Sequence, residues 1–120
     1  MLKKSDAPRI VNVTSGLASL TLQSDMSWRF YNFKTSAYAP SKTALNAYTI
    51  ALAYELKDTL FKVNAVDPGY TATDFNNYRG TNDIPTAASY IVKYAILDET
   101  GPTGKFISFD NNPVTGESPW

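Results

Sequence analysis

The chain has 120 residues, with eleven basic and eleven acidic side chains and therefore no net charge. Its lysines are scattered rather than clustered, so nothing points to binding of nucleic acid or of a membrane surface. Cysteine and histidine are absent, which excludes disulfides, thiolate nucleophiles, a Ser-His-Asp relay and the usual zinc ligand sets. Any chemistry must therefore use Ser, Tyr, Lys or carboxylate side chains, and we expect no metal site.

The sequence also sets an expectation for location. The N-terminal segment has no apolar stretch of signal-peptide length, and no apolar stretch elsewhere is long enough to span a bilayer. We therefore expect a cytoplasmic protein whose partners are small molecules or other proteins.

The first predicted element is a strand near the N-terminus. Ile10, Val11 and Val13 form a β-branched run bounded by a proline and a glycine, which predicts a buried strand of a parallel sheet. Residues 16–35 show no clean period, and their aromatic side chains lie among polar ones. We expect this segment to be a long loop, with room for one helical turn, folded over a cleft.

The pattern then alternates between helices and strands. From Ser36 to about Asp58, apolar side chains recur at helical spacing with alanines between them, and Pro40 lies near the start, where a missing backbone donor is tolerated. Residues 61–66 predict a second strand, 84–97 a second helix, 105–109 a third strand and 111–120 an irregular tail. This order predicts an α/β fold in which crossover helices join about three parallel strands.

Three short segments carry the candidate chemistry. Ser15 ends the first predicted strand, and a hydroxyl there could hold a substrate carbonyl at the ligand-binding edge of the sheet. Tyr38 and Lys42 share one face of the first helical turns, so the ammonium could favour the phenolate and make Tyr38 a general acid/base. Taken alone, Ser15 is more often a turn or cap residue, and the pair is more often an ordinary helix start.

The third segment ends the second strand. Pro68 and Gly69, followed by Thr71 and Thr73, offer backbone amides and hydroxyls to a polar ring substituent. As a lone element, this segment is merely a turn between a strand and a helix.

The three segments together indicate a function more specifically than any one of them does alone. Asn12-Val-Thr-Ser15, Tyr38-x-x-x-Lys42 and Asn64-Ala-Val-Asp-Pro-Gly69-x-x-x-Thr73 occur in this order at the ends of alternating elements. Over nearly the whole chain they resemble the short-chain dehydrogenase/reductase superfamily, with its Rossmann-like doubly wound parallel sheet. The wide spacing between Ser15 and Tyr38, which looks like an insertion around residues 24–34, and the tail after residue 100 are similar to the carbonyl-reductase-like branch.

The resemblance implies a role for each matching residue. Ser15 would hydrogen-bond the substrate carbonyl or alcohol, Tyr38 would donate and accept the proton, and Lys42 would bind the nicotinamide ribose and favour the ionised tyrosine. The segment that lines the nicotinamide is matched by Pro68, Gly69, Tyr70 and Thr73. Residues 74–83 match a substrate loop whose sequence varies with substrate. The implied cofactor is NADP or NAD, with NADP favoured by the carbonyl-reductase resemblance.

One part of the family pattern is missing from the sequence. No Gly-rich turn for the dinucleotide pyrophosphate precedes Ser15, and the family's catalytic asparagine has no counterpart. We therefore expect residues 1–120 to form a partial domain, the catalytic half without its N-terminal dinucleotide-binding half. A bare sheet edge next to the first strand would follow.

Three functions remain open at this point. The first is an NAD(P)-dependent carbonyl reductase or alcohol dehydrogenase, in truncated form, acting on a small carbonyl or alcohol. The second is a non-catalytic interaction protein that pairs with itself or with another chain, such as a missing N-terminal half, through the bare edge. The third is a related enzyme using the same tyrosine and lysine for epimerisation or dehydration. The Pro-Gly-x-x-x-Thr turn favours simple carbonyl reduction.

Overall fold

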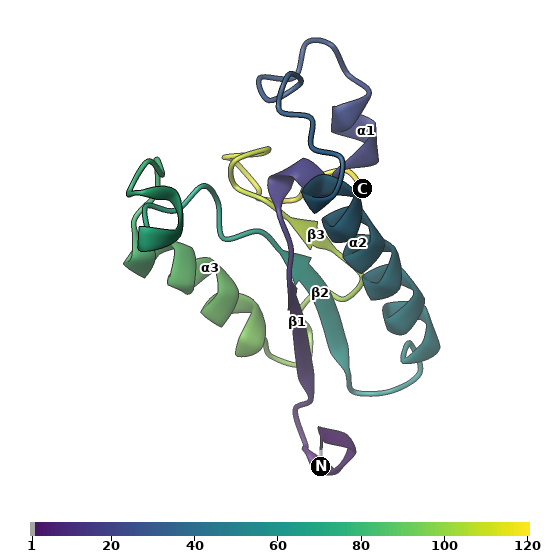
Figure 1. Ribbon diagram of the computed structural model, residues 1–120. Coiled ribbons are helices and arrows are strands. Elements are labelled where there is room, and N and C mark those ends of the chain that lie inside the picture. The colour runs from purple at the N-terminus through teal and green to yellow at the C-terminus, as the bar shows by residue number, and fades with distance from the viewer. Residues whose placement is uncertain (1) are drawn as a thin grey trace.

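The computed structural model describes residues 2–120, so Met1, the first residue of the predicted domain, lies outside it. The main elements are β1 (Arg9–Val13), α2 (Tyr38–Glu55), β2 (Lys62–Val66), α3 (Ile84–Ala95) and β3 (Phe106–Ile107). The short helices are η1 (Leu2–Lys4), η2 (Gly16–Ala18), α1 (Leu20–Gln23) and η3 (Asp74–Asn76). The strands form one parallel sheet in the order β1-β2-β3, and the predicted α/β fold is confirmed (Figure 1).

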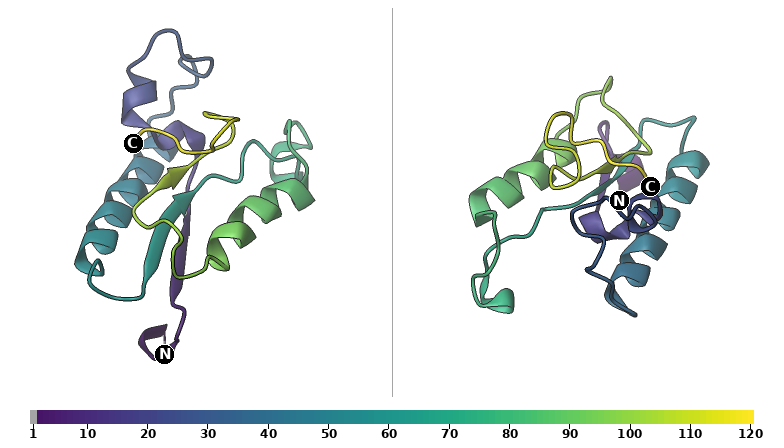
Figure 2. Two further views of the ribbon diagram at one scale, coloured as in Figure 1. Left: turned by 180° about the vertical axis from the view of Figure 1, so that it is seen from behind. Right: turned by 90° about the horizontal axis from the view of Figure 1, so that it is seen from above.

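Helices cover both faces of this sheet. In Figure 2, seen from above, α2 and α3 lie on opposite sides of the strands. Side chains alternate across a strand, so neighbouring residues enter different cores. The core on the α3 side contains Val66, Tyr94 and Ile107. The other core contains Ala18, Ala65 and Phe106, with Trp120 packed against them.

The first strand is less buried than its sequence predicts. β2 is buried from Val63 onward, whereas every residue of β1 is half-buried except Val13, which is 46% exposed. The reason is position, because among residues 2–120 β1 pairs only with β2. A β-branched run indicates a strand, but it does not tell a central strand from an edge strand.

The register brings the strand ends together. Val13 pairs with Val66, and Val66 pairs in turn with Ile107. The hydrogen bonding continues one step further, since the Thr14 amide donates to Val66 at 2.9 Å and the Asp67 amide donates to Ile107 at 2.8 Å. The residues that follow all three strands therefore lie at one edge of the sheet.

The long helix α2 begins two residues later and ends earlier than its sequence predicts. The Thr35 hydroxyl accepts a hydrogen bond from the Ala39 amide at 2.9 Å, which satisfies one free donor of the first turn. At the other end, the amide of Leu56 closes the last turn onto Leu52. No helix among residues 2–120 is both long enough and apolar enough to cross a membrane.

A polar joint fixes α2 against β1. The Asn12 amide donates to the Thr49 hydroxyl at 2.9 Å, and the Thr14 hydroxyl donates to the Asn46 carbonyl oxygen at 2.7 Å. Thr49, Asn46 and Thr14 are buried, so these bonds are shielded from competition with water. The joint sets the rotation of α2 about its axis and hence the direction in which its first turn points.

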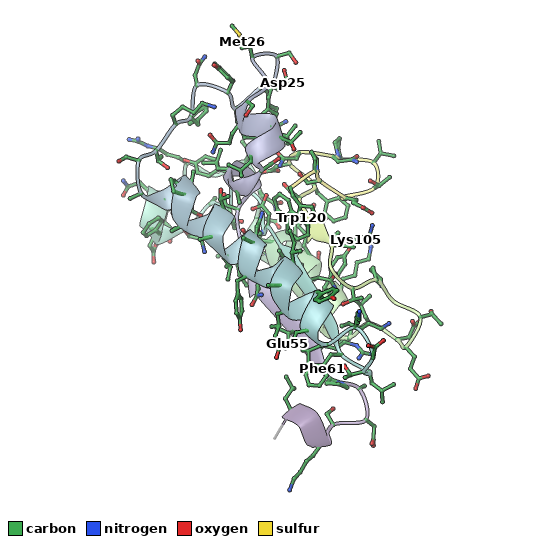
Figure 3. The ribbon with its side chains drawn as sticks, turned by 90° about the vertical axis from the view of Figure 1, so that its right-hand side faces the viewer. Asp25, Met26, Glu55, Phe61, Lys105 and Trp120 are labelled. Carbon is green, nitrogen blue, oxygen red and sulfur yellow. The ribbon has the colours of Figure 1, made fainter. Side chains whose placement is uncertain are left out.

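The segment between β1 and α2 contains the single helical turn that we expected, α1, preceded by η2. Ser19 caps α1 by accepting a hydrogen bond from the Leu22 amide at 3.1 Å. The rest of the segment consists of turns that project beyond the sheet, with Asp25 and Met26 near the tip in Figure 3.

The end of the chain is more ordered than predicted. The third strand is shorter than the predicted 105–109, and α3 ends at Ala95 rather than at residue 97. The tail returns antiparallel to β3, with a bridge between Ile107 and Glu117. The Ser118 amide donates to Phe106 at 2.9 Å, and the Trp120 ring stacks on the Phe106 ring at 5.6 Å. The tail has no helix or strand of its own, as the sequence predicts, but its contacts with β3 fix its position.

Asn64 offers a test of this fold. Its side chain is fully buried in β2, donates to the Pro102 carbonyl at 2.9 Å and accepts from the Lys105 amide at 3.0 Å. Asn64→Leu keeps the branched shape but leaves both backbone groups unpaired, so we expect a loss of roughly 2–4 kcal/mol in the free energy of unfolding. Denaturant titration measures it, with the exposed Asn32→Leu as control. Equal stability of the two variants would contradict this account.

Candidate active site

Ser15 lies where the sequence predicts, two residues beyond the end of β1. It is half-buried, its backbone is extended, and its hydroxyl caps η2 by accepting a hydrogen bond from the Leu17 amide at 3.2 Å. This bond uses a lone pair of the oxygen and leaves the hydroxyl proton free to donate to a substrate.

Tyr38 is the first residue of α2, and its side chain is 49% exposed. The Lys42 ammonium lies one turn further along, 5.9 Å from the centre of the Tyr38 ring. The same ammonium donates to the Val13 carbonyl at 3.1 Å. Lys42 therefore connects the start of α2 to the end of β1 and holds a positive charge beside the tyrosine.

The turn after β2 is held by two carboxylates. The Gly69 amide donates to Asp67 at 3.0 Å, and the Tyr70 amide donates to Asp110 at 2.9 Å. Gly69 has a φ of 79°, in the left-handed region that a side chain rarely adopts. A residue with a side chain at this position would strain the turn and push toward the Asp110 carboxylate.

Asp67 is the most unusual ionisable group of the site. The pKa of its carboxyl is raised to about 6, chiefly by burial and in smaller part by the negative charge of Asp110. Hydrogen bonds from the Ser108 hydroxyl, at 2.7 Å, and from the Gly69 amide oppose this rise. The carboxyl therefore changes charge within the range of pH at which enzymes are usually assayed.

The loop that follows is closed at its base. Thr71 and Asn82 form a bridge, and the Ala72 amide donates to Asn82 at 2.9 Å. A side-chain carbon at Gly80 would lie 2.0 Å from the Ala72 nitrogen, so the two arms cross at a distance that only glycine permits. The tip of the loop, η3, carries Phe75, whose side chain is 98% exposed.

These segments enclose one cavity of about 660 Å³. Six of the seven predicted site residues line it: Ser15, Tyr38, Pro68, Gly69, Tyr70 and Thr73. Lys42, the seventh, does not line it and lies behind Tyr38. Residues far apart in the sequence are thus brought to one cleft at the carboxyl ends of the strands, as expected for a parallel α/β sheet.

Sequence reasoning missed other residues of this cleft. Asp67 was noted only as part of the turn, and Asp110 was given no role, although each follows a predicted strand at the ligand-binding edge. Their position directly after a predicted strand could have identified both carboxylates as candidate site residues. Arg29, Phe30 and Phe33 of the segment before α2 also line the cavity, which confirms that this segment folds over a cleft.

The cleft has groups that suit a nicotinamide ring but none of the usual groups that hold the phosphates of the same cofactor. Hydroxyls and backbone amides lie beside an aromatic wall, and the volume is of the size that a small ring and its substrate occupy. The sequence contains no Gly-rich turn at a helix N-terminus, which is the usual cradle for a pyrophosphate. The residues present therefore fit the reactive end of a dinucleotide and not its phosphates.

Known proteins are similar to this chain in sequence. The family model for short chain dehydrogenases matches residues 1–83. A (+)-neomenthol dehydrogenase from Arabidopsis thaliana is 34% identical, over 90% of this chain and 47% of its own length. Salutaridine reductase from Papaver somniferum is 30% identical over 88% of this chain and 44% of its own.

Solved structures agree with these relatives. The structure of salutaridine reductase from Papaver somniferum superposes with a TM-score of 0.70 at 29% identity, over 87% of this chain and 46% of that one. Carbonyl reductase Sniffer of D. melanogaster gives a TM-score of 0.67 at 29% identity, over 93% and 41%. The chain thus spans about half the length of the curated relatives that it matches. The predicted resemblance is confirmed, and the chain belongs to the short-chain dehydrogenase/reductase family, with carbonyl-reductase-like relatives.

Proposed function

We propose that this chain is the catalytic part of an NAD(P)-dependent oxidoreductase that interconverts a carbonyl compound and its alcohol. The observation that carries the proposal is the shared cleft, in which Ser15, Tyr38 and the turn 68–70 meet although they come from three separate segments. Membership of the family supports the same reaction.

The roles of the two hydroxyls follow from their places in the cleft. The Ser15 proton is free to donate to a carbonyl oxygen, which orients the substrate and stabilises negative charge that develops on that oxygen. Tyr38 gives its proton to the same oxygen during reduction and takes it back during oxidation. The nicotinamide, when bound, supplies or accepts the hydride.

Lys42 acts on Tyr38 through its charge. Its ammonium, beside the tyrosine ring and anchored on the Val13 carbonyl, stabilises the negative charge that the phenol oxygen acquires when it gives up its proton. Two of its three hydrogens are left for other acceptors, and we assign one to the ribose of the cofactor.

The turn after β2 is the part of this chain that would hold the nicotinamide. Pro68, Gly69, Tyr70 and Thr73 line the cleft opposite Tyr38 and present backbone groups and a hydroxyl. We propose NADP as the preferred cofactor on the carbonyl-reductase resemblance, with NAD as the other possibility. The phosphates require a separate cradle, so the assays below join the chain to the Gly-rich dinucleotide-binding segment of a relative, by fusion or co-expression.

Replacing Tyr38 tests the proposed chemistry. Tyr38→Phe removes only the ionisable hydroxyl, so we expect NADPH-dependent reduction of a carbonyl substrate to slow by about two orders of magnitude or more. The measurement is kcat in the joined protein. Tyr48→Phe, the same change at an exposed position of α2 outside the cleft, is the control. Full activity of Tyr38→Phe would contradict the proposed role of Tyr38 as the proton donor and acceptor.

The walls of the cleft indicate the kind of substrate. Phe30 and Phe33 line one side, and Tyr70 and Phe75 come from the turn and loop after β2. Aromatic rings are large apolar surfaces that gain free energy when a ligand covers them. We propose a bulky, ring-containing carbonyl compound, in line with the cyclic compounds after which neomenthol dehydrogenase and salutaridine reductase are named.

Phe75 provides the test of this substrate class. Because its ring is almost fully exposed without substrate, covering it contributes to binding, and Phe75→Ala should raise KM for a bulky cyclic ketone by about tenfold. A short acyclic ketone should be affected much less. Val114→Ala, at a position that is 88% exposed and lies outside the cleft, is the control. An equal rise in KM for both ketones would contradict the proposal.

The open edge of β1 favours a second candidate function. Within residues 2–120 this strand has one neighbour, and unpaired strand edges promote pairing with another chain. The chain would then act as an interaction protein. Light scattering across a concentration series should show a mass that rises with concentration. A single monomeric mass throughout would exclude self-association through this edge.

A further inference from the structure

One carboxylate lies where the ends of all three strands meet. The Asp67 side chain, 5% exposed, follows β2 and accepts from the Gly69 amide in its own turn. It also accepts from the hydroxyl of Ser108, which follows β3. On its third side is Gly16, next to Ser15 after β1, which packs against the carboxyl.

The contact with Gly16 is close. A side-chain carbon built on Gly16 would lie 3.0 Å from Asp67 Oδ2 and 3.1 Å from the Ser108 hydroxyl oxygen. The Gly16 carbonyl accepts from the Asn111 amide at 3.0 Å, which ties the same turn to the segment after β3. The Ser15–Gly16 turn therefore rests directly on the carboxylate that also holds the Pro68–Gly69 turn.

We propose that Asp67 is a positioning residue, which sets the turn bearing Ser15 and the turn bearing Pro68 and Gly69 at the separation that the reaction needs. The proposal rests on the function proposed above. Asp67 does not itself touch the reacting atoms; it acts through Gly16 and Gly69. Small displacements of reacting groups cost large factors in rate, so a group that couples two halves of a site has a kinetic effect.

Ionisation of Asp67 strengthens this arrangement. The Gly69 amide and the Ser108 hydroxyl both donate to the carboxylate, and Gly16 packs against the oxygen that accepts from Ser108. A protonated carboxyl is a donor at one oxygen and a weaker acceptor at the other, so protonation of Asp67 weakens the contact with at least one turn.

Other charged or titratable groups face the same region. They are Asp110, Arg29, Tyr38, Tyr70 and, behind Tyr38, Lys42. Of these, Asp110 raises the pKa of Asp67 through its negative charge.

The buried charge costs stability. The pKa of Asp67 is raised to about 6 from an ordinary value of 3.8, so the folded protein binds its proton more tightly than the unfolded chain does. Its contribution to stability is most favourable below about pH 4 and is lost as the pH rises through about 6. A carboxylate that opposes folding at neutral pH, while it joins two segments of the site, is what a functional role leads one to expect.

The first experiment follows the backbone amides by NMR between about pH 4 and pH 8. We expect the Gly16 and Gly69 signals to shift together with a midpoint near pH 6, and this shared titration to vanish in Asp67→Asn. Asp98→Asn, at an exposed carboxyl whose hydrogen bonds to Thr100 lower its pKa, is the control and should leave the titration unchanged. Separate midpoints, or a shared titration that persists in Asp67→Asn, would overturn the proposal.

The second experiment measures kinetics in the joined protein. Asp67→Asn keeps the shape but removes the charge and replaces one acceptor oxygen with an N–H donor, so kcat should fall about tenfold while KM for the carbonyl substrate changes little. The acid limb of the pH–rate profile should disappear with it. Unchanged kcat and an unchanged acid limb would show that Asp67 only supports the fold.

A third variant keeps the proposal testable if Asp67→Asn does not fold. Ser108→Ala removes one donor and leaves the carboxylate in place, so it should move the shared NMR midpoint to higher pH; an unmoved midpoint would count against the coupling. If the wild-type joined protein were inactive, the proposed function would fail, whereas the NMR titration would still decide whether Asp67 couples the two turns.

Discussion

Parallel pairing of three short strands is the constraint on which the cleft depends. Parallel strands place their carboxyl ends at one edge, and the register Val13–Val66–Ile107 aligns those ends to within a residue. The residues that follow the three strands are therefore brought to one place by the strand pairing itself. The hydroxyl, the turn and the carboxylates of the site all derive from this alignment.

The polar joint between β1 and α2 is the second constraint on the site, because it fixes the rotation of α2 about its axis. Parallel pairing says nothing about how a covering helix is rotated, and an apolar seam of alanines tolerates several rotations. Two buried hydrogen bonds, from Asn12 to Thr49 and from Thr14 to Asn46, select one of them. That choice directs Tyr38 into the cleft and the Lys42 ammonium onto the Val13 carbonyl.

Much of this could be predicted from local pattern. The strands and helices follow from periodicity, and six of the seven predicted site residues line the cleft because each stands at the end of an element. The antiparallel return of the tail was missed, since Glu117 meets Ile107 through contacts made only after folding. The burial of Asp67 was missed for the same reason: its neighbours Gly16 and Ser108 come from the other two strands.

The close crossing of the two arms at Gly80 makes the tip of the loop after β2 a segment that can be exchanged. Its two arms are joined at Thr71 and Asn82, and the Asn82 side chain also donates to the Pro68 carbonyl at 3.1 Å, so the base of the loop is fixed to the Pro68–Gly69 turn. Insertions or substitutions between residues 74 and 78 can therefore remodel one wall of the cleft while the opposite wall keeps its geometry. Natural selection or protein engineering can change which substrates enter the cleft without displacing the residues that are proposed to react with them.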